Sequence, residues 1–317
     1  MFALFALAIG VFCVVAALIV LAVAVAQARV LRVTRLHVTV PHWPPHAGRV
    51  RIAHLSDLHL PHTPVPLERL VGAVTDIDPH VIVVSGDTVS WNADIDTAAS
   101  TIRRLAEHAP VLCVSGNTEH MYGLDIPAFA AAVEHAGGVL LRDQHWSETL
   151  SGAKVCVLGL EYRRDAAPDI GSVLAEAPAA DLTIVLAHSP SVWPHVPRER
   201  AHLLLCGHTH GGQLRIPLLG PMIAHSRIEW ELKSGIFELP RQGGDWGSLR
   251  RVFTHEELCR DDSVRRHRLR RGRPLMCVTR GVGSVLLAAR LGSPPEVIGI
   301  TAGGETAGDS GGDTEGG

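Results

Sequence analysis

Residues 51–59 read RIAHLSDLH, a short apolar run that ends in a polar turn. A run of this length and composition, bounded by polar residues, is typical of a buried strand, so we expect a strand over residues 51–55. The turn that follows carries Asp57 and His59, a carboxylate and an imidazole that both bind divalent metal ions in proteins. The stretch therefore predicts a strand whose carboxyl end carries part of a metal site.

The same arrangement recurs four more times along the chain. The further apolar runs and the side chains that follow them are 81–84 with Asp87, 111–114 with Asn117 and Thr118, 182–187 with His188, and 202–206 with His208 and His210. Helical patterns lie between the first runs, at 67–77, 95–108 and 126–136. Strands that alternate with helices, followed mostly by strands, predict an α/β fold with sheets packed between helices.

We expect the five turns to meet at one site, because the carboxyl ends of strands line the ligand crevice of open α/β sheets. Together they offer carboxylate, imidazole and amide oxygen, with no thiolate. This set suits Mn²⁺, Fe or Zn²⁺ and contains too much imidazole for a Ca²⁺ cage. Single pairs such as Asp-x-His occur often by chance, so the ordered set of five carries the prediction.

The five motifs, in this order, resemble the calcineurin-like metallophosphoesterases over about residues 49–213. The string GHTHGGQ at 207–213 and the apolar N-terminus resemble the branch of membrane-associated bacterial phosphoesterases and transmembrane proteins with a metallophosphoesterase domain. The resemblance implies a four-layer α/β sandwich and a site for two divalent metal ions. It also implies a ligand set: Asp57, His59 and His210 for the first metal, Asn117, His188 and His208 for the second, and Asp87 as the bridge.

One position departs from the family pattern. The family usually has a histidine after the asparagine of the third motif, where it stabilises the transition state or protonates the leaving group, and here Thr118 stands there. A threonine hydroxyl can donate a hydrogen bond but supplies no proton near neutral pH. Either the leaving group needs little acid assistance, or His120 or another residue substitutes, or activity is weak. Glu119 is more readily explained as a structural residue than as an acid.

The resemblance therefore implies a hydrolase of phosphodiester or phosphoanhydride bonds, with Asp87, Asn117, Thr118 and His208 as the catalytic residues. The alternative is a metal-binding membrane scaffold or sensor with vestigial catalysis. We expect a lipid bilayer and a phosphorylated small-molecule or lipid substrate as partners, and no nucleic acid. The resemblance points further to a lipid-linked diphosphate, with activity of the UDP-2,3-diacylglucosamine pyrophosphatase type.

The first 28 residues contain no charged side chain, and as a helix they span about 40 Å, enough to cross a bilayer. We expect a retained single-pass transmembrane anchor. The alternative is a signal peptide cleaved near 26–28, although the run is long for one and has no basic start. Arg29, Arg32 and Arg35 follow the run, and the positive-inside tendency places the catalytic domain in the cytoplasm.

The rest of the chain divides by composition. We expect a linker over 29–48, the phosphoesterase domain over 49–301, an insertion over 242–273 and a disordered acidic tail over 302–317. The insertion includes VRRHRLRRGR at 264–273, whose six arginines suit a solvated loop, an anionic lipid surface or a phosphorylated substrate equally well. The apolar segment 216–223 predicts either a packed loop or a membrane contact.

Overall fold

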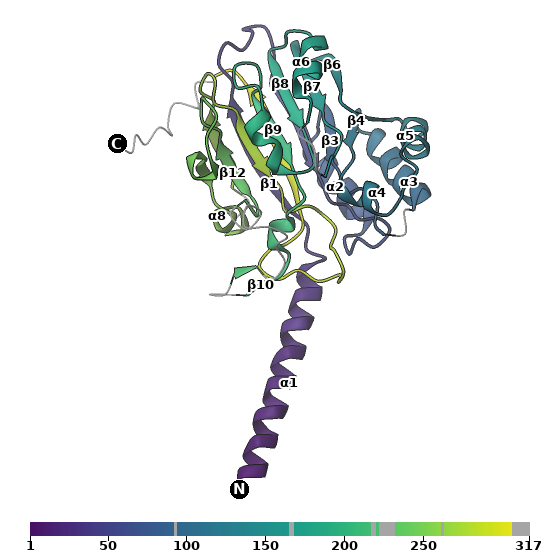
Figure 1. The fold of residues 1–317 in the computed structure, drawn as a ribbon, viewed down its shortest axis with the longest axis vertical. Helices are drawn as coiled ribbons and strands as arrows, with labels where there is room; N and C mark the ends of the chain where they lie inside the picture. The colour runs from purple at the N-terminus through teal and green to yellow at the C-terminus, as the bar shows by residue number, and fades with distance from the viewer. Residues whose placement is uncertain (92–93, 165–167, 217–219, 222–231, 261–262, 306–317) are drawn as a thin grey trace, which may run out of the picture.

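Two seven-stranded sheets face each other at the centre of the molecule (Figure 1). The structure is a computed structural model that describes residues 1–305 apart from 92–93, 165–167, 217–219, 222–231 and 261–262. Within these residues the sheet orders are β14-β1-β16-β2-β3-β4-β5 and β13-β12-β15-β9-β8-β7-β6.

The first sheet is built from β1 Arg32–Thr39, β2 Val50–Leu55, β3 Val81–Ser85, β4 Val111–Val114, β5 Gly138–Leu140, β14 Arg265–Arg268 and β16 Glu296–Gly303. The second is built from β6 Gln144–Leu150, β7 Ala153–Gly159, β8 Leu182–Leu186, β9 Leu203–Cys206, β12 Gly235–Glu238, β13 Arg250–Phe253 and β15 Leu275–Val278. The short strands β10 Arg215–Ile216 and β11 Gly220–Pro221 pair separately. The strands β2 to β5 run parallel, as do β7, β8, β9 and β15.

Three apolar layers hold the sheets and helices together. One joins the inner faces of the two sheets, through residues such as Ile52, Val83 and Leu205. The second lies under α2 Leu67–Thr75, α3 Ile95–Ala106 and α5 Ile126–His135, and the third under α6 Ile170–Glu176 and the 3-10 helix η1 Pro190–His195. Helices therefore cover both outer faces, and the predicted four-layer α/β sandwich is confirmed. The central strands are buried on both faces, which explains their continuous apolar runs.

The expected linker over 29–48 is wrong for its first half, because residues 32–39 form strand β1 inside the first sheet. β1 pairs with β16 along its whole length and with β14 along its second half. Its alternate residues Leu36 and Val38 are buried against the core. The partner strand lies more than 250 residues away, and the arginines of β1 resemble a membrane flank, so the period-two pattern of β1 is obscured in the sequence.

The stretch 242–273 belongs to the sandwich as well. It contributes β13 at the edge of the second sheet, α8 His255–Arg260, and β14 at the edge of the first. β14 pairs with the far half of β1, where Thr39 lies roughly 23 Å from Arg32 at 3.3 Å per residue. The arginines of 266–273 therefore lie toward the end of the sandwich away from the N-terminal helix. The alternative that they contact the bilayer crossed by that helix is wrong.

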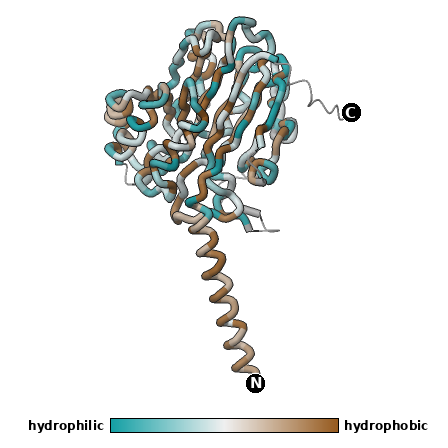
Figure 2. The backbone as a smooth tube through the Cα atoms, turned by 180° about the vertical axis from the view of Figure 1, so that it is seen from behind, coloured by the Kyte–Doolittle hydropathy of each residue, from teal (hydrophilic) through white to brown (hydrophobic). Residues whose placement is uncertain are grey.

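The N-terminal helix α1 Phe2–Gln27 is apolar along its length and projects from the domain (Figure 2). It is the one helix of the described residues that is long and apolar enough to cross a membrane. Its last turn contacts the domain, because Ala24 and Ala28 are buried and the Arg290 backbone N–H donates to the Ala24 carbonyl at 2.9 Å. Only four residues separate Gln27 from β1, so the domain is joined directly to the helix. Most of the expected tail, from 306 on, and most of the segment 216–223 lie outside the described residues.

Candidate metal centre

The turns after β2, β3, β4, β8 and β9 converge at one end of the sandwich. Register explains why they meet: Leu55 pairs with Val84, and Leu186 pairs with Leu205, so neighbouring strands end at the same level. All seven predicted ligands lie within this group of turns, namely Asp57, His59, Asp87, Asn117, His188, His208 and His210.

A first cluster is formed by Asp57, His59 and His210, whose ligand atoms all lie within 4.8 Å of one another. The Nε2 atoms of the two histidines are 3.1 Å apart, and His210 Nε2 is 3.5 Å from Asp57 Oδ1. All three side chains are buried. Two imidazoles and a carboxylate therefore point at one small volume.

A second cluster is formed by Asn117, His188 and His208. His188 Nε2 lies 2.9 Å from Asn117 Oδ1 and 3.0 Å from His208 Nδ1. The other nitrogen of His188, Nδ1, lies 2.8 Å from the Ser85 carbonyl oxygen, which can only accept a hydrogen bond. This contact fixes the proton on Nδ1 and leaves Nε2 free to act as a ligand.

Asp87 lies between the clusters and presents a different oxygen to each. Its Oδ2 is 3.7 Å from His59 Nε2 in the first cluster, and its Oδ1 is 3.4 Å from His188 Nε2 in the second. The backbone N–H of Thr118 also donates to Oδ1, at 2.9 Å. A carboxylate placed in this way can be shared by two cations.

The spacing of the ligand atoms fits metal coordination. Two ligands bound at about 2.1 Å to one ion, and 90–109° apart, lie about 3.0–3.4 Å from each other. The observed separations within the two clusters, from 2.9 to 3.5 Å, match this range. The donor set and its spacing therefore suit two divalent ions.

The protonation states favour metal binding too. Burial lowers the pKa of His59 and, far more, that of His210, so both rings are neutral at neutral pH. Burial alone would raise the pKa of Asp87, but the neighbouring His188 and His59 and the Thr118 N–H outweigh it and hold this pKa below its usual value. Neutral imidazole and ionised carboxylate are the forms that bind metals.

Five of the seven predicted ligands have left-handed backbone conformations, which are uncommon for residues other than glycine. Their φ angles are 52° for Asp57, 49° for His59, 51° for Asp87, 74° for His208 and 50° for His210. Such conformations cost about 1–3 kcal/mol each and persist only where the surrounding structure enforces them. Their concentration in the ligand turns marks this end of the sandwich as the functional one.

Close packing enforces the geometry around Asp57. A Cβ on Gly207 would collide with the Asp57 carboxylate, and one on Gly281 would lie 2.7 Å from the Asp57 Cβ. The backbone N–H of His208 donates to both carboxylate oxygens at 3.1 Å. These glycines let two further turns approach the Asp57 side chain and fix its orientation.

Glu119 fixes the third turn relative to the second. Its buried carboxylate accepts hydrogen bonds from the backbone N–H groups of Gly116, Asp87, Thr88 and Val89 at 2.7–3.2 Å. Burial, together with the charge of Asp87, raises the pKa of Glu119 to about 7. A carboxylate occupied in this way has a structural role, and it does not line the cavity.

A cavity of about 260 Å³ opens over the second cluster. The predicted site residues in its wall are Asp87, Asn117, Thr118, His208 and His210. Thr118 lines it with its hydroxyl turned away, because that hydroxyl donates to the Val89 carbonyl at 2.8 Å. His120 is not among the lining residues, and its Nε2 lies 2.9 Å from the Ser115 hydroxyl. Neither side chain is thus placed as an acid.

Several residues around the cavity could not be predicted from the sequence. Tyr162, Arg164 and Lys233 line it, and the Tyr162 ring lies 5.7 Å from the ring of His188 in an edge-on arrangement. None of the three follows a strand with a recognisable motif. In the sequence they carry no signal that separates them from other polar loop residues.

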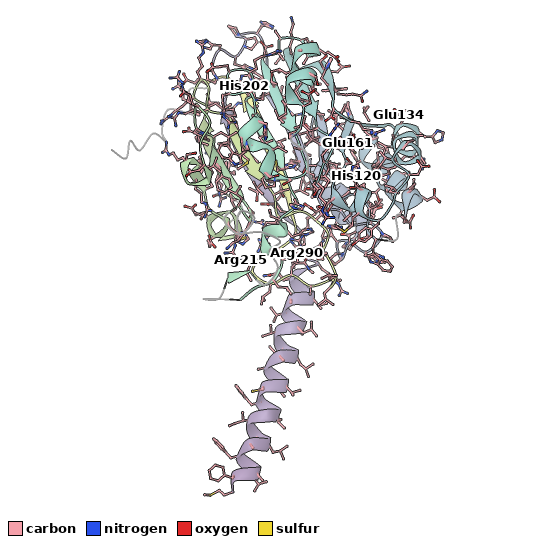
Figure 3. The ribbon with its side chains drawn as sticks, viewed as in Figure 1. His120, Glu134, Glu161, His202, Arg215 and Arg290 are labelled. Carbon is pink, nitrogen blue, oxygen red and sulfur yellow. The ribbon has the colours of Figure 1, made fainter. Side chains whose placement is uncertain are left out.

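Arg290 contacts His210 of the first cluster and lies beside the C-terminal end of α1 (Figure 3). It is wholly buried, donates to the carbonyl oxygens of Gly283 and Arg280, and places its NH2 group 3.3 Å from His210 Nδ1. Burial lowers its pKa to about 9. Its backbone N–H meanwhile bonds α1, so one residue joins the metal centre to the helix.

Comparison with known proteins agrees with this geometry. Residues 50–212, half of the chain, match the model of the calcineurin-like phosphoesterase family. The chain belongs to this family. The matched range runs from the start of β2 to the GHTH turn and includes all seven predicted ligands. Calcineurin-like phosphoesterases use two divalent metal ions, in agreement with the two clusters.

The curated relatives include bacterial and vertebrate proteins. The chain is 27% identical over 180 residues to the uncharacterized metallophosphoesterase YkuE of Bacillus subtilis strain 168, covering 55% of this chain and 62% of that one. It is 29% identical over 197 residues to the phosphodiesterase YaeI of Escherichia coli strain K12, covering 56% and 67%. A bovine transmembrane protein with metallophosphoesterase domain is 27% identical over 200 residues, covering 57% and 45%.

Proposed function

We propose that this protein is a membrane-anchored hydrolase of phosphodiester or phosphoanhydride bonds. In this proposal Asp57, His59 and His210 hold one divalent metal, Asn117, His188 and His208 hold a second, and Asp87 bridges them. The convergence of these side chains, with the two Asp87 oxygens turned to different clusters, is the observation that carries the proposal. Two metal ions bound there would polarise a phosphate group and lower the pKa of the attacking water.

The residues of the chain supply the rest of the site. Asn117 and His208 lie where the second cluster meets the cavity, so they orient the phosphate as it binds. Tyr162, Lys233 and Arg164 line the same cavity with one phenol and two cations, which suit the negative oxygens of a phosphate. With the Thr118 hydroxyl bonded to the Val89 carbonyl, the position that holds the family's histidine supplies no acid, so substrates with good leaving groups are favoured.

We propose that the substrate carries its phosphate close to a bilayer, in a lipid or a lipid-linked diphosphate. The metal centre lies at the end of the sandwich where α1 joins it, and Arg290 contacts both. An activity of the UDP-2,3-diacylglucosamine pyrophosphatase type fits this position, because a diphosphate leaving group needs little acid assistance. Hydrolysis of lipid phosphates by the full chain in mixed micelles, compared with soluble nucleotide diesters, tests this: no preference for lipid phosphates would overturn it.

The proposal places the catalytic domain in the cytoplasm. Arg29 and Arg32 are exposed just beyond α1, and the positive-inside tendency places such a basic flank in the cytoplasm. A C-terminal reporter fusion that is active only inside the cytoplasm is the expected result. Activity only on the outer side would overturn this orientation.

A metal-binding scaffold with vestigial catalysis is the second candidate, and the engaged hydroxyl of Thr118 is the observation that favours it. The purified protein with added Mn²⁺ and bis(p-nitrophenyl) phosphate distinguishes the two. Turnover that is lost in Asp87→Asn supports the enzyme. Two bound metals without turnover support the scaffold.

A further inference from the structure

A loop at the base of the domain exposes two neighbouring leucines. Residues 285–289, here the base loop, connect β15 to β16 on the side of α1. Leu286 is 90% exposed and Leu287 is 59% exposed, and Leu286 has a left-handed φ of 63°. Single exposed apolar residues are ordinary, but two adjacent leucines, one in a strained conformation, on a loop tip need an explanation.

The base loop packs against the last turns of α1. Leu287, Ala288 and Ala289 line a groove of about 450 Å³ together with Leu21 and Val25. Beside it, the Arg290 N–H donates to the Ala24 carbonyl. The loop and the membrane helix therefore lie side by side, at the level of residues 21–25.

The length of α1 indicates how deep in the bilayer its residues 21–25 lie. About 20 residues of helix fill a hydrocarbon layer of about 30 Å, and the part of α1 that precedes the buried Ala24 has about this length, so the layer reaches to about Leu21. Leu21 and Val25 then lie at the boundary between the acyl chains and the headgroups. Because Leu287 shares a groove with both, it lies at the same boundary.

Other residues at this groove are of the kind found at membrane interfaces. Arg29 lines it beyond the end of α1, where its charge can reach the headgroups. His62 also lines the groove, and the ring of Trp91 stacks on His62 at 5.3 Å while remaining 66% exposed. Tryptophan is enriched at the headgroup level of bilayers.

The base loop is also bonded to the metal-binding turn. The side-chain NH₂ of Gln213 donates to the carbonyl oxygens of Val285, Leu287 and Ala289 at 2.8–3.2 Å, and its Oε1 accepts from the Val285 N–H at 2.9 Å. Gln213 is buried, lies three residues after His210 and, like Val285, lines the catalytic cavity. A displacement of the base loop therefore reaches the cavity through Val285 itself and through the Gln213 side chain.

We propose that the base loop inserts Leu286 and Leu287 into the interfacial layer of the same bilayer that holds α1. The insertion is a second membrane contact, and through Gln213 it holds the catalytic cavity facing the lipid surface. The contact itself needs only the anchor in a bilayer, and the effect on catalysis rests on the lipid substrate proposed above. A second copy of the chain, or another protein, is the competing occupant of the leucines.

Fluorescence tests the contact. In the full chain with Cys13→Ala, which removes the exposed cysteine of α1, Leu286→Cys is labelled with an environment-sensitive dye and reconstituted into phosphatidylcholine–phosphatidylglycerol vesicles. Arg271→Cys, at the far end of the domain, is the matched control, and the Cys13→Ala chain measures background labelling. The expected result is a blue-shifted emission at 286, quenched by lipids carrying shallow quenchers, with no such change at 271.

Two outcomes overturn the contact. One is a dye at 286 that is as exposed to water as the dye at 271. The other is a dye that is shielded but beyond the reach of the lipid quenchers, which assigns the leucines to a protein partner.

Activity tests the coupling separately. In vesicles, Leu286→Asp is expected to lower the ratio of lipid-phosphodiester to bis(p-nitrophenyl) phosphate hydrolysis about tenfold, while Leu286→Met leaves the ratio unchanged. An unchanged ratio in Leu286→Asp, with the dye inserted, overturns the coupling. If the unmodified chain hydrolyses only the soluble diester, the lipid substrate fails, and the fluorescence result still decides the membrane contact.

Discussion

The two clusters of the metal centre differ in how far they are removed from solvent. In the first, Asp57, His59 and His210 are all buried, and only His210 reaches the cavity wall. In the second, Asn117 and His208 are half-buried and line the cavity, with only His188 fully enclosed. We therefore expect the first cluster to retain its metal and the second to present its metal to the substrate.

The bridge between the clusters gives the largest expected effect. Asp87→Asn removes the shared charge, so we expect loss of most metal from both positions and a fall in turnover of about 1,000-fold, since metal ions supply several kcal/mol of transition-state stabilisation. Metal content by mass spectrometry and hydrolysis of bis(p-nitrophenyl) phosphate measure both. Asp96→Asn, exposed on α3, is the matched control. Two metals per chain with normal turnover in Asp87→Asn would contradict the bridge.

Single-ligand variants separate the clusters. We expect His59→Ala and His208→Ala each to reduce two metals per chain to one and to lower turnover about 100-fold, about 2.7 kcal/mol. The remaining metal should leave slowly during dialysis against EDTA in His208→Ala, where the buried cluster is intact. It should leave quickly in His59→Ala. Equal rates of loss would remove the distinction between the clusters.

The buried side chain of His54 makes the stability of the folded protein depend on pH. His54 is wholly buried, its Nε2 lies 2.9 Å from the Ser85 hydroxyl, and burial lowers its pKa from 6.5 to about 3. Below pH 6.5 the unfolded chain takes up a proton that the folded chain refuses, so stability falls as pH falls. Between pH 7 and pH 5, His54 contributes about 2 kcal/mol to this loss. Urea unfolding of the metal-free protein in detergent measures it, and the same loss in His54→Gln would show that His54 is not its source.

The smallest expected effect concerns the missing acid. Because the Thr118 hydroxyl is bonded to Val89, we expect turnover to fall steeply as the pKa of the leaving group rises. Thr118→His should raise turnover of poor leaving groups about tenfold and leave good ones nearly unchanged. A series of aryl phosphodiesters supplies the measurement. A flat dependence in the unmodified chain would reveal an acid, and Tyr162→Phe would be the first variant to test.

The sequence was sufficient for the elements that are locally encoded. Continuous apolar runs such as 81–84 and 111–114 predict strands within a residue or two, and the polar turns after them predict the residues that converge. The features that could not be predicted depend on partners that are distant in the sequence. Strand β1 is defined by pairing with β16, and the roles of Gln213 and Arg290 are defined by loops more than 70 residues away. No local pattern contains that information.

The left-handed ligand turns have a consequence for how this protein tolerates change. Five non-glycine residues hold conformations that asparagine and glycine adopt more readily, so the sequence that binds metal is not the sequence of greatest stability. Asp87→Asn keeps the shape of the side chain and suits a φ of 51° better than aspartate does. In metal-free protein, this backbone preference should therefore offset part of the stability that Asp87→Asn loses with the charge that His188, His59 and the Thr118 N–H stabilise. Selection at this position acts on chemistry against the preference of the fold.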